Sequence, residues 1–289
     1  MPLTRRQVLF SAAASAARPA APRPALCLFS KHLPKLDYDA LGRQVREFGF
    51  DGVDLTVRPG GHVLPENAAR DLPRAAEAVR SHGLSLPMIT TALTSASDPS
   101  ARPILATAAG LGIPFFKLGY WYYRSPDVER TLAETRRDVE TLAGLAKQYG
   151  IAAGFHNHSD DYVGAPVWDI RDIIAGLDPR WIGYYFDPCH AVAEGGVAGW
   201  RIALRLALPR LKMVALKDFY WEKRGGRWQM IMCPLGEGMV DWPKFFSMLA
   251  AANFTGPISL HVEYEAKDEL SAIANDLEFM KKHVRAAYT

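Results

Sequence analysis

The stretch YGIAAGFHNH, residues 149–158, decides the fold of this chain. A glycine ends a long amphipathic pattern, an apolar run follows it, and the run ends in two histidines that flank an asparagine. Glycine directly after a helical pattern is a helix-stop signal, and a short apolar run is typical of a buried strand. The stretch therefore predicts a helix, a tight turn and a strand that carries polar side chains at its C-terminal end.

The same arrangement recurs along most of the chain. Apolar runs predict eight strands at 25–30, 52–57, 84–91, 114–119, 151–156, 182–187, 212–217 and 257–263. Helical patterns lie at 37–48, 66–82, 99–111, 126–149, 168–176, 198–208, 241–252 and 268–286. Strands that alternate with helices indicate parallel βα units, so residues 25–289 are predicted to form a single-domain (β/α)8 TIM barrel. A doubly wound open sheet is the alternative, but no G-x-G-x-x-G motif opens the first helix.

Residues 1–24 differ from the rest of the chain. The paired arginines Arg5 and Arg6 precede an alanine-rich run and then a Pro/Ala/Arg stretch. This order resembles a twin-arginine export signal with a linker, and it predicts cleavage near residues 17–21 and a periplasmic protein. A disordered basic tail is the alternative interpretation.

Charge and cysteine content exclude several classes of protein. The chain has 34 basic and 31 acidic residues, and without the four arginines of residues 1–24 the balance is 30 to 31. No concentrated basic face is therefore expected, and nucleic acid is not a predicted partner. No uncharged apolar run of 18 residues predicts a membrane span. Three cysteines allow at most one disulfide, so the fold does not depend on a disulfide framework.

Polar side chains gather at the predicted C-terminal strand ends, where TIM barrels carry their active sites. The fifth strand ends in His156 and His158, the sixth in Asp187, and the eighth in His261 and Glu263. Residues two apart on a strand share a face, so each pair is expected to point to one side. Imidazoles and carboxylates from neighbouring strands suit Mn, Zn, Fe or Co. A polar barrel mouth that binds a neutral solute is the alternative.

Lysines and aromatic residues also follow the strands. Lys117 ends the fourth strand and Lys217 the seventh, while Trp121 and Trp221 belong to the aromatic runs that come next. Aromatic rings beside polar groups suit the apolar faces of a sugar, so Lys117, Trp121 and Trp221 are interpreted as sugar-binding residues. Loop packing or an oligomer contact would explain the aromatic runs equally well. The absence of a glycine-rich phosphate loop favours an unphosphorylated sugar.

These motifs resemble the xylose-isomerase-like barrel superfamily, which includes sugar isomerases and epimerases, inosose dehydratases and AP-endonuclease barrels. Residues 187–191, DPCHA, resemble its Asp-x-x-His-Ala motif, in which the aspartate binds metal. Residues 156–158, HNH, stand where the superfamily usually places a metal-binding glutamate. Residues 236–242, GEGMVDW, resemble the segment before its seventh helix, and residues 60–63, GGHV, a loop whose histidine faces the site. The resemblance covers residues 25–288.

Two positions depart from the pattern of this superfamily. Its seventh strand usually reads His-x-Lys-Asp with the histidine as a ligand, whereas Ala215 stands in that place here. His156 also replaces the glutamate of the fifth strand. The resemblance still implies a divalent metal, Mn, Co, Zn or Fe, on a reduced ligand set. The candidate ligands are His156, Asp187, His261 and Glu263.

The resemblance implies a metal-dependent sugar isomerase or epimerase that removes a proton next to a keto-sugar carbonyl. Glu263 is the expected base. Lys217 is the second candidate, because a nearby cation and partial desolvation are expected to lower its pKa toward neutrality; a structural ion pair is the alternative. His158 is interpreted as a catalytic proton relay, and His62 and His190 as ligands of sugar hydroxyls; support of a metal-bound carboxylate is the alternative for His158 and His190.

Two other functions stay open at this point. A 3-keto-glycoside lyase or hydrolase would use the same first proton abstraction. A non-catalytic periplasmic sugar-binding barrel would explain the two missing ligands. In each case the expected partner is a small sugar, with no membrane partner, and the sequence leaves a homo-oligomer open.

Overall fold

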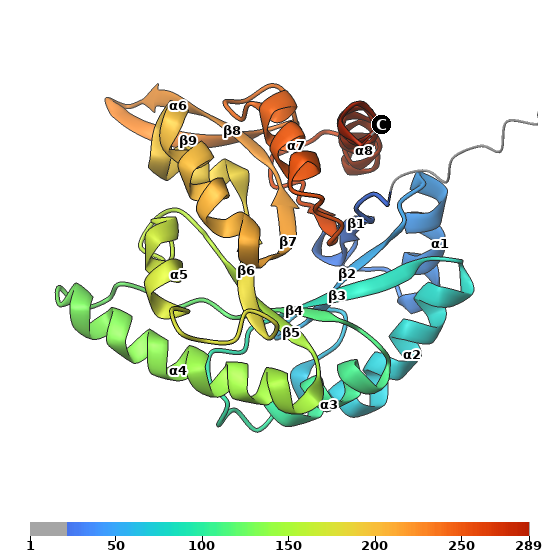
Figure 1. Cartoon of the computed structure of the whole chain (residues 1–289). Coiled ribbons are helices and arrows are strands. Elements are labelled where there is room, and N and C mark those ends of the chain that lie inside the picture. The colour runs from blue at the N-terminus through green and yellow to red at the C-terminus, as the bar shows by residue number, and fades with distance from the viewer. Residues whose placement is uncertain (1–21, 289) are drawn as a thin grey trace, which may run out of the picture.

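Eight parallel strands close into a barrel that is ringed by helices (Figure 1). The computed structural model of the chain describes residues 22–288. The strands of the barrel follow the order β1-β10-β7-β6-β5-β4-β3-β2, which confirms the predicted TIM barrel. They are β1 (Leu26–Phe29), β2 (Gly52–Val57), β3 (Ser85–Thr91), β4 (Phe115–Lys117), β5 (Ala152–His156), β6 (Ile182–Phe186), β7 (Leu211–Leu216) and β10 (Ile258–Leu260).

A helix follows each barrel strand, and most lie within a few residues of their predicted positions. They are α1 (Tyr38–Phe48), α2 (Ala68–Ser81), α3 (Ala101–Gly110), α4 (Val128–Tyr149), α5 (Val167–Ile173), α6 (Pro188–Ala207), α7 (Trp242–Ala251) and α8 (Glu269–Ala287). Short 3-10 turns lie at η1 (Ser30–His32), η2 (Pro65–Asn67) and η3 (Leu208–Arg210).

Aspartates define where several helices begin. The side chains that accept backbone N–H groups at the starts of α1, α4, α6, α7 and α8 are Asp37, Asp127, Asp187, Asp241 and Asp268. A carboxylate in this position satisfies a free amide and complements the helix dipole. At the other end of α4, Gly150 takes the left-handed conformation with φ +72°, which confirms the helix stop expected there.

The core has two layers. A large apolar layer lies between the strands and the helices, and a smaller one of Met88, Tyr185, Met213 and Ala215 fills the barrel interior. Gly154 belongs to this interior, where an added Cβ would collide with the methyl group of Met213. The packed interior leaves the inward-facing polar residues at the C-terminal end of the barrel as the floor and walls of any ligand site.

A hairpin that the sequence analysis did not predict follows β7. Its strands β8 (Asp218–Arg224) and β9 (Arg227–Cys233) pair antiparallel and extend beyond the barrel (Figure 1). The carboxylate of Asp218 fixes the chain as it returns. It accepts backbone N–H groups of Phe219 (2.9 Å), Gly236 (3.0 Å), Gly238 (3.3 Å) and Val240 (3.3 Å), and the indole N–H of Trp242 (2.7 Å). The motif at residues 236–242 therefore has a structural role around Asp218.

Helix α6 begins earlier than predicted. It starts at Pro188, directly after β6, whereas the helical pattern was placed at residues 198–208. Gly196 breaks the helical geometry with φ 59° and ψ −159°, so the pattern before the kink is short and its period is interrupted. Cys189 and His190 consequently lie in the first turn of α6.

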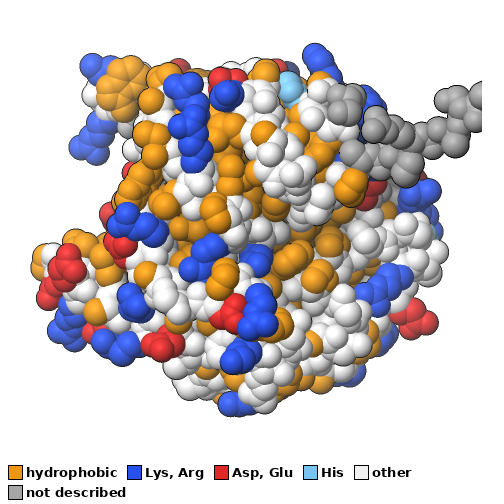
Figure 2. Space-filling model, in the orientation of Figure 1, with side chains coloured by type: hydrophobic (Ala, Val, Ile, Leu, Met, Phe, Trp, Pro, Cys, Tyr) orange, Lys and Arg blue, Asp and Glu red, His pale blue; other side chains and the backbone are white. Residues whose placement is uncertain are grey.

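The predicted export signal lies almost wholly outside the described residues. Arg23, at the end of the predicted linker, forms a two-pronged ion pair with Asp51 at 2.8 and 2.9 Å. Between residues 22 and 288, Cys27, Cys189 and Cys233 are all free and buried, and no helix has the length and apolar character needed to cross a membrane. On the face shown in Figure 2, acidic and basic side chains are interspersed.

Candidate active site

A small polar cavity lies at the C-terminal end of the barrel. Its volume is about 130 Å³, and each of the eight barrel strands, or the loop after it, contributes a lining residue. Sites for drug-sized ligands are typically larger than about 300 Å³, so this cavity suits a small molecule such as one sugar ring. The predicted site residues that line it are Lys117, His156, His158, Lys217, His261 and Glu263.

The ammonium of Lys217 lies between two carboxylates. Its Nζ is 2.9 Å from Glu263 Oε2 and 3.6 Å from Asp187 Oδ2, and the side chain is 2% exposed. Burial opposes the charge, but Asp187 and Glu263 outweigh burial and raise the pKa of Lys217 above its usual range. The expectation that this pKa falls toward neutrality is therefore wrong, and the alternative of an ion pair is correct.

Glu263 is held by two amines. Its second oxygen lies 3.1 Å from Nζ of Lys31, while Lys217 holds the first. Burial alone would raise the pKa of Glu263, but Lys217, then His261 and Lys31, lower it well below its usual range. Such a carboxylate stays ionised and has little tendency to take a proton, which makes it a weak base in this arrangement.

His156 connects Tyr120 to Asp187. Its Nε2 is 3.3 Å from Asp187 Oδ2, and its Nδ1 is 2.8 Å from the hydroxyl of Tyr120. Burial, then Lys117 and Lys217, keep the pKa of His156 well below its usual value, so the ring is neutral. We assign the ring proton from this network. Nε2–H donates to the carboxylate of Asp187, and Nδ1 accepts a hydrogen bond from the hydroxyl of Tyr120. Burial also raises the pKa of Asp187 to about 6.

His158 presents an unprotonated nitrogen beside the cavity. Its Nδ1 lies 2.9 Å from the carbonyl oxygen of Ser159, which can only accept, so Nδ1 carries the proton and Nε2 has a free lone pair. Burial, then Lys217, lower the pKa of His158 below its usual value. The ring packs on His190 with centroids 3.8 Å apart.

His190 supports His158 from behind. Its Nδ1 lies 2.6 Å from the hydroxyl oxygen of Ser159, and it is not among the residues that line the cavity. The structure therefore gives it a supporting position in place of the predicted contact with a sugar. Its buried Nε2 has no hydrogen-bond partner within residues 22–288 and lies 3.7 Å from Asp187 Oδ2.

Lys117 is the second buried lysine of the cavity, and its surroundings differ from those of Lys217. Its Nζ lies 3.4 Å from the centroid of the Tyr120 ring, the residue is 3% exposed, and no described carboxylate forms an ion pair with it. Burial, followed by the charge of Arg58, lowers the pKa of Lys117 well below its usual value. The shift expected for Lys217 thus occurs at Lys117.

Tyr185 lines the cavity and Asp54 lies behind it, bonded to the lining residues Tyr185 and Thr90, and the sequence analysis missed both. The buried carboxylate of Asp54 accepts from Thr90 and Ser259, each at 2.8 Å, and from Tyr185 at 3.3 Å. Burial raises the pKa of Asp54 to about 6. The sequence did contain a signal for Asp54, which is an aspartate inside the apolar run 52–57. A buried carboxylate needs hydrogen-bond or ionic partners, so its presence there indicates a polar cluster.

Two predicted sugar-binding tryptophans lie away from the cavity. Trp121 stacks on Phe155 at 5.4 Å and donates its indole N–H to Asp138 at 3.0 Å, so it packs between the barrel and α4. Its neighbour Tyr120 lines the cavity in its place. Trp221 lies on the hairpin, is 41% exposed and does not line the cavity. The aromatic runs lie at this end of the barrel, and the ring that lines the cavity is Tyr120 and neither of the two tryptophans.

His62 also lies outside the cavity. Its Nε2 is 3.1 Å from the carbonyl oxygen of Leu33, and its Nδ1 is 3.3 Å from the hydroxyl oxygen of Thr56. Both ring nitrogens are therefore engaged in joining the loops that follow β1 and β2. The predicted role of His62 in binding substrate has no geometric support.

The predicted metal ligands are not arranged to hold a metal ion. Within residues 22–288, no group of three or more His, Cys, Asp or Glu side chains has a suitable arrangement. The amine of Lys217 lies between the carboxylates of Asp187 and Glu263, while His261 turns its Nε2 toward Tyr185 at 3.1 Å. Ala215 adds no donor. The set predicted from His156, Asp187, His261 and Glu263 therefore fits an ammonium and does not fit a divalent ion.

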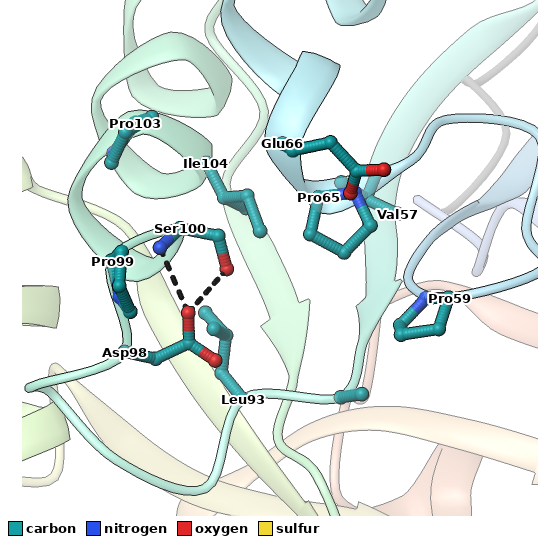
Figure 3. A pocket seen from close by; sticks show the side chains of 11 residues that line it. Val57, Pro59, Pro65, Glu66, Leu93, Asp98, Pro99, Ser100, Pro103 and Ile104 are labelled. Atoms are coloured by element: carbon teal, nitrogen blue, oxygen red, sulfur yellow. Dashed lines mark hydrogen bonds between the residues drawn. The ribbon is translucent and has the colours of Figure 1, made fainter.

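A larger cleft lies beside the barrel mouth, between the loops after β2 and β3 and the start of α3 (Figure 3). Its volume is about 610 Å³, and prolines and other apolar side chains form much of its wall. Asp98 accepts from the backbone and hydroxyl of Ser100 at 2.8 and 2.7 Å, and Glu66 is its other acidic residue. It contains no lysine or histidine, whereas the smaller cavity is lined by both.

Comparison with known proteins places these features in context. Residues 43–283 match a family model described as "Xylose isomerase-like TIM barrel". The chain is 24% identical over 168 residues to the "Putative L-ribulose-5-phosphate 3-epimerase SgbU" of Haemophilus influenzae. That match covers 56% of each protein, so the chain spans little more than half the length of this curated relative.

Solved structures with the same fold share little sequence with the chain. The 3-keto-D-glucoside 4-epimerase YcjR of E. coli, in its apo form, has a TM-score of 0.72 at 15% identity, over 90% of this chain and 100% of that one. A xylose isomerase-like TIM barrel protein of Mycobacterium smegmatis in complex with magnesium has a TM-score of 0.68 at 18% identity, over 92% and 98%. At such identities these likenesses establish the fold.

Proposed function

The chain belongs to the xylose isomerase-like TIM barrel family, and on this premise we propose that it is a sugar epimerase or isomerase. The proposed reaction moves a proton at the carbon next to a keto-sugar carbonyl. One observation carries the proposal: a fixed ammonium, Lys217, and an unprotonated imidazole nitrogen, on His158, line the same small cavity. The names of similar proteins, an L-ribulose-5-phosphate 3-epimerase and a 3-keto-D-glucoside 4-epimerase, support this class of reaction.

We propose that Lys217 donates a hydrogen bond to the carbonyl oxygen of the substrate. An ammonium has three N–H donors, and the carboxylates of Glu263 and Asp187 engage at most two of them in this structure. A remaining N–H can bond to the oxygen on which negative charge develops as the carbon loses its proton. Because the charge and the donor are already held in place, they stabilise the enolate without reorganisation during the reaction.

His158 is the proposed base, in place of Glu263. Its Nε2 is unprotonated at neutral pH, since burial keeps the ring neutral and Nδ1 carries the proton. Glu263 forms ion pairs with Lys31 and Lys217, and both ion pairs would have to weaken before the carboxylate took a proton. The step balances as a proton passing from carbon to His158, while the electron pair of the C–H bond forms the enolate.

Glu263 has a different proposed role. It follows β10, whereas His158 follows β5, and β6 and β7 separate these two strands in the barrel, so the two side chains reach the cavity from different directions. We assign Glu263 to orienting Lys217 and the substrate. Glu263→Gln is then expected to weaken substrate binding and slow turnover while isotope exchange remains measurable.

A 3-keto-glycoside lyase is the second candidate function. It shares the proton abstraction next to a keto group, and the enolate would then expel the glycosidic substituent. Likeness in fold to a 3-keto-D-glucoside 4-epimerase is the observation that favours a 3-keto sugar as the substrate class to examine.

One experiment tests these possibilities together. The protein is incubated in D₂O with free ketoses and with 3-keto glycosides, and proton NMR follows the hydrogen next to the carbonyl. Loss of that signal with a new sugar epimer or isomer supports the proposed function, whereas release of the aglycone supports the lyase. Binding with no exchange for any of these sugars would contradict both enzymes and support a binding barrel.

A further inference from the structure

We propose that the ammonium of Lys217 is the resident cation of this cavity and that the protein needs no divalent metal. The statement that the reaction needs no divalent metal rests on the proposed function. The statement that Lys217 is the cation of the cavity does not. Its basis is the position of Lys217 between Asp187 and Glu263, which are two of the four predicted metal ligands.

The first argument is spatial. Transition metals bind carboxylate oxygens at about 2.0–2.2 Å. Nζ of Lys217 already lies 2.9 Å from one carboxylate and 3.6 Å from the other, so it occupies the space in which one ion would have to touch both. The side chain is 2% exposed and cannot simply swing into solvent to make room.

The second argument is the balance of charge. Lys31, Arg58 and Lys217 are the cations that line the cavity, and the acidic groups nearest to it are Asp54, Asp187 and Glu263. The fifth strand contributes the imidazole of His156 and no carboxylate, so no further anion offsets an added dication. Placing a charge of +2 beside a buried ammonium is costly in a medium of low dielectric constant.

The third argument is that the surrounding donors are already engaged. His156 divides its two nitrogens between Tyr120 and Asp187, and His261 directs Nε2 to the hydroxyl of Tyr185. Position 215 is an alanine packed in the barrel interior, so the seventh strand offers the amine of Lys217 and no imidazole. The buried Nε2 of His190 lacks a partner, but one nitrogen does not complete a site.

The test begins with the unmodified protein. It is purified without chelator, incubated with Mn²⁺, Co²⁺ or Zn²⁺, passed through a desalting column and analysed for metal by mass spectrometry. We expect less than about 0.1 equivalent of any metal, and isotope exchange that changes by less than about twofold in EDTA. About one equivalent of bound metal, or exchange that is lost in EDTA and restored by metal, would overturn the inference.

A variant that lacks the ammonium tests whether Lys217 excludes a metal ion from this cavity. Lys217→Ala removes the ammonium and leaves Asp187, Glu263 and His156 around the vacated space, so Co²⁺ binding should rise at least about fivefold over the unmodified protein. Lys31→Ala is the matched control, because it removes the other amine of Glu263 without opening the space between the two carboxylates. An equal gain in both variants would contradict the role assigned to Lys217.

The two proposals fail in different ways. If no sugar exchanges its hydrogen with or without added metal, the proposed function is wrong, while the metal analysis still decides which cation the cavity holds. If exchange appears only after metal is added, the proposed function stands and the inference about Lys217 is overturned. Should Lys217→Ala fail to fold, the measurements on the unmodified protein are sufficient to decide.

Discussion

Replacing His158 by glutamine should remove proton transfer and leave the cavity close to its present shape. The ring lies between His190 and Tyr162, with centroid separations of 3.8 and 4.3 Å, and Nδ1 donates to the carbonyl oxygen of Ser159. A glutamine amide is polar and similar in length, and its N–H₂ can replace the Nδ1 donor. It cannot take up a proton near neutral pH, which isolates the function assigned to Nε2.

The expected loss follows from the role of a general base. Such a group typically contributes about 10²–10⁴ in rate, which corresponds to about 3–5.5 kcal/mol of barrier. Loss of the ring contacts should lower the free energy of unfolding by about 1 kcal/mol. Deuterium exchange into the sugar is the assay. Because burial, then Lys217, lower the pKa of His158, exchange by the unmodified protein should rise with pH to a midpoint below 6.5 and level off above it.

His283→Gln is the control for this variant. That ring packs on Phe246 and Phe279 in the outer layer of helices, at 5.6 and 4.4 Å, so the change costs similar packing far from the cavity. Its exchange rate should stay within about threefold of the unmodified rate. If His158→Gln exchanges normally and Glu263→Gln does not, Glu263 is the base and our inference from its two ion pairs is refuted.

The other predictions concern stability and export. Asp54 has a pKa raised from 3.8 to about 6, so its folded form favours the proton and the protein should lose up to about 3 kcal/mol of stability as pH rises from about 4 to 7. Asp54→Asn should lack that part of the dependence in urea unfolding; an unchanged dependence would contradict the assignment. Asp218→Ala leaves several amides without their acceptor, so it should cost at least about 3 kcal/mol and expose the hairpin to limited proteolysis. We also propose twin-arginine export: replacing Arg5 and Arg6 by lysine should hold the precursor in the cytoplasm, and undiminished periplasmic protein would disprove it.

The barrel was predictable because its signals are local. Stretches such as 149–158 contain a helix stop, an apolar strand and a polar strand end within ten residues, and parallel strands bring their C-terminal ends together. The two-residue periodicity of a strand also placed His156, Lys217 and Glu263 correctly toward the inside. These inferences did not require knowing which side chains are in contact across the barrel.

Properties that depend on contacts between side chains of different strands were not predictable. Lys117 and Lys217 occupy equivalent places at strand ends, yet their pKa values shift in opposite directions, because two carboxylates flank only Lys217. The ion pairs of Lys217 with Asp187 and Glu263 depend on the same contacts between separate strands, so the sequence did not reveal them. The hairpin is a different case, since the Gly225-Gly226 pair between β-prone runs is a turn signal that went unused when the aromatic residues before it were assigned to sugar binding.

The hairpin β8–β9 also affects how folded molecules behave toward one another. A closed barrel leaves no strand edge unpaired, whereas a two-stranded ribbon carries two open edges that can pair with a neighbouring chain. Glu222, Lys223, Arg224 and Arg227 surround the tip of this ribbon, next to Trp228, which is 66% exposed. Charged side chains on open edges discourage such pairing. The charges of these four residues therefore oppose edge-to-edge association between folded copies of the chain.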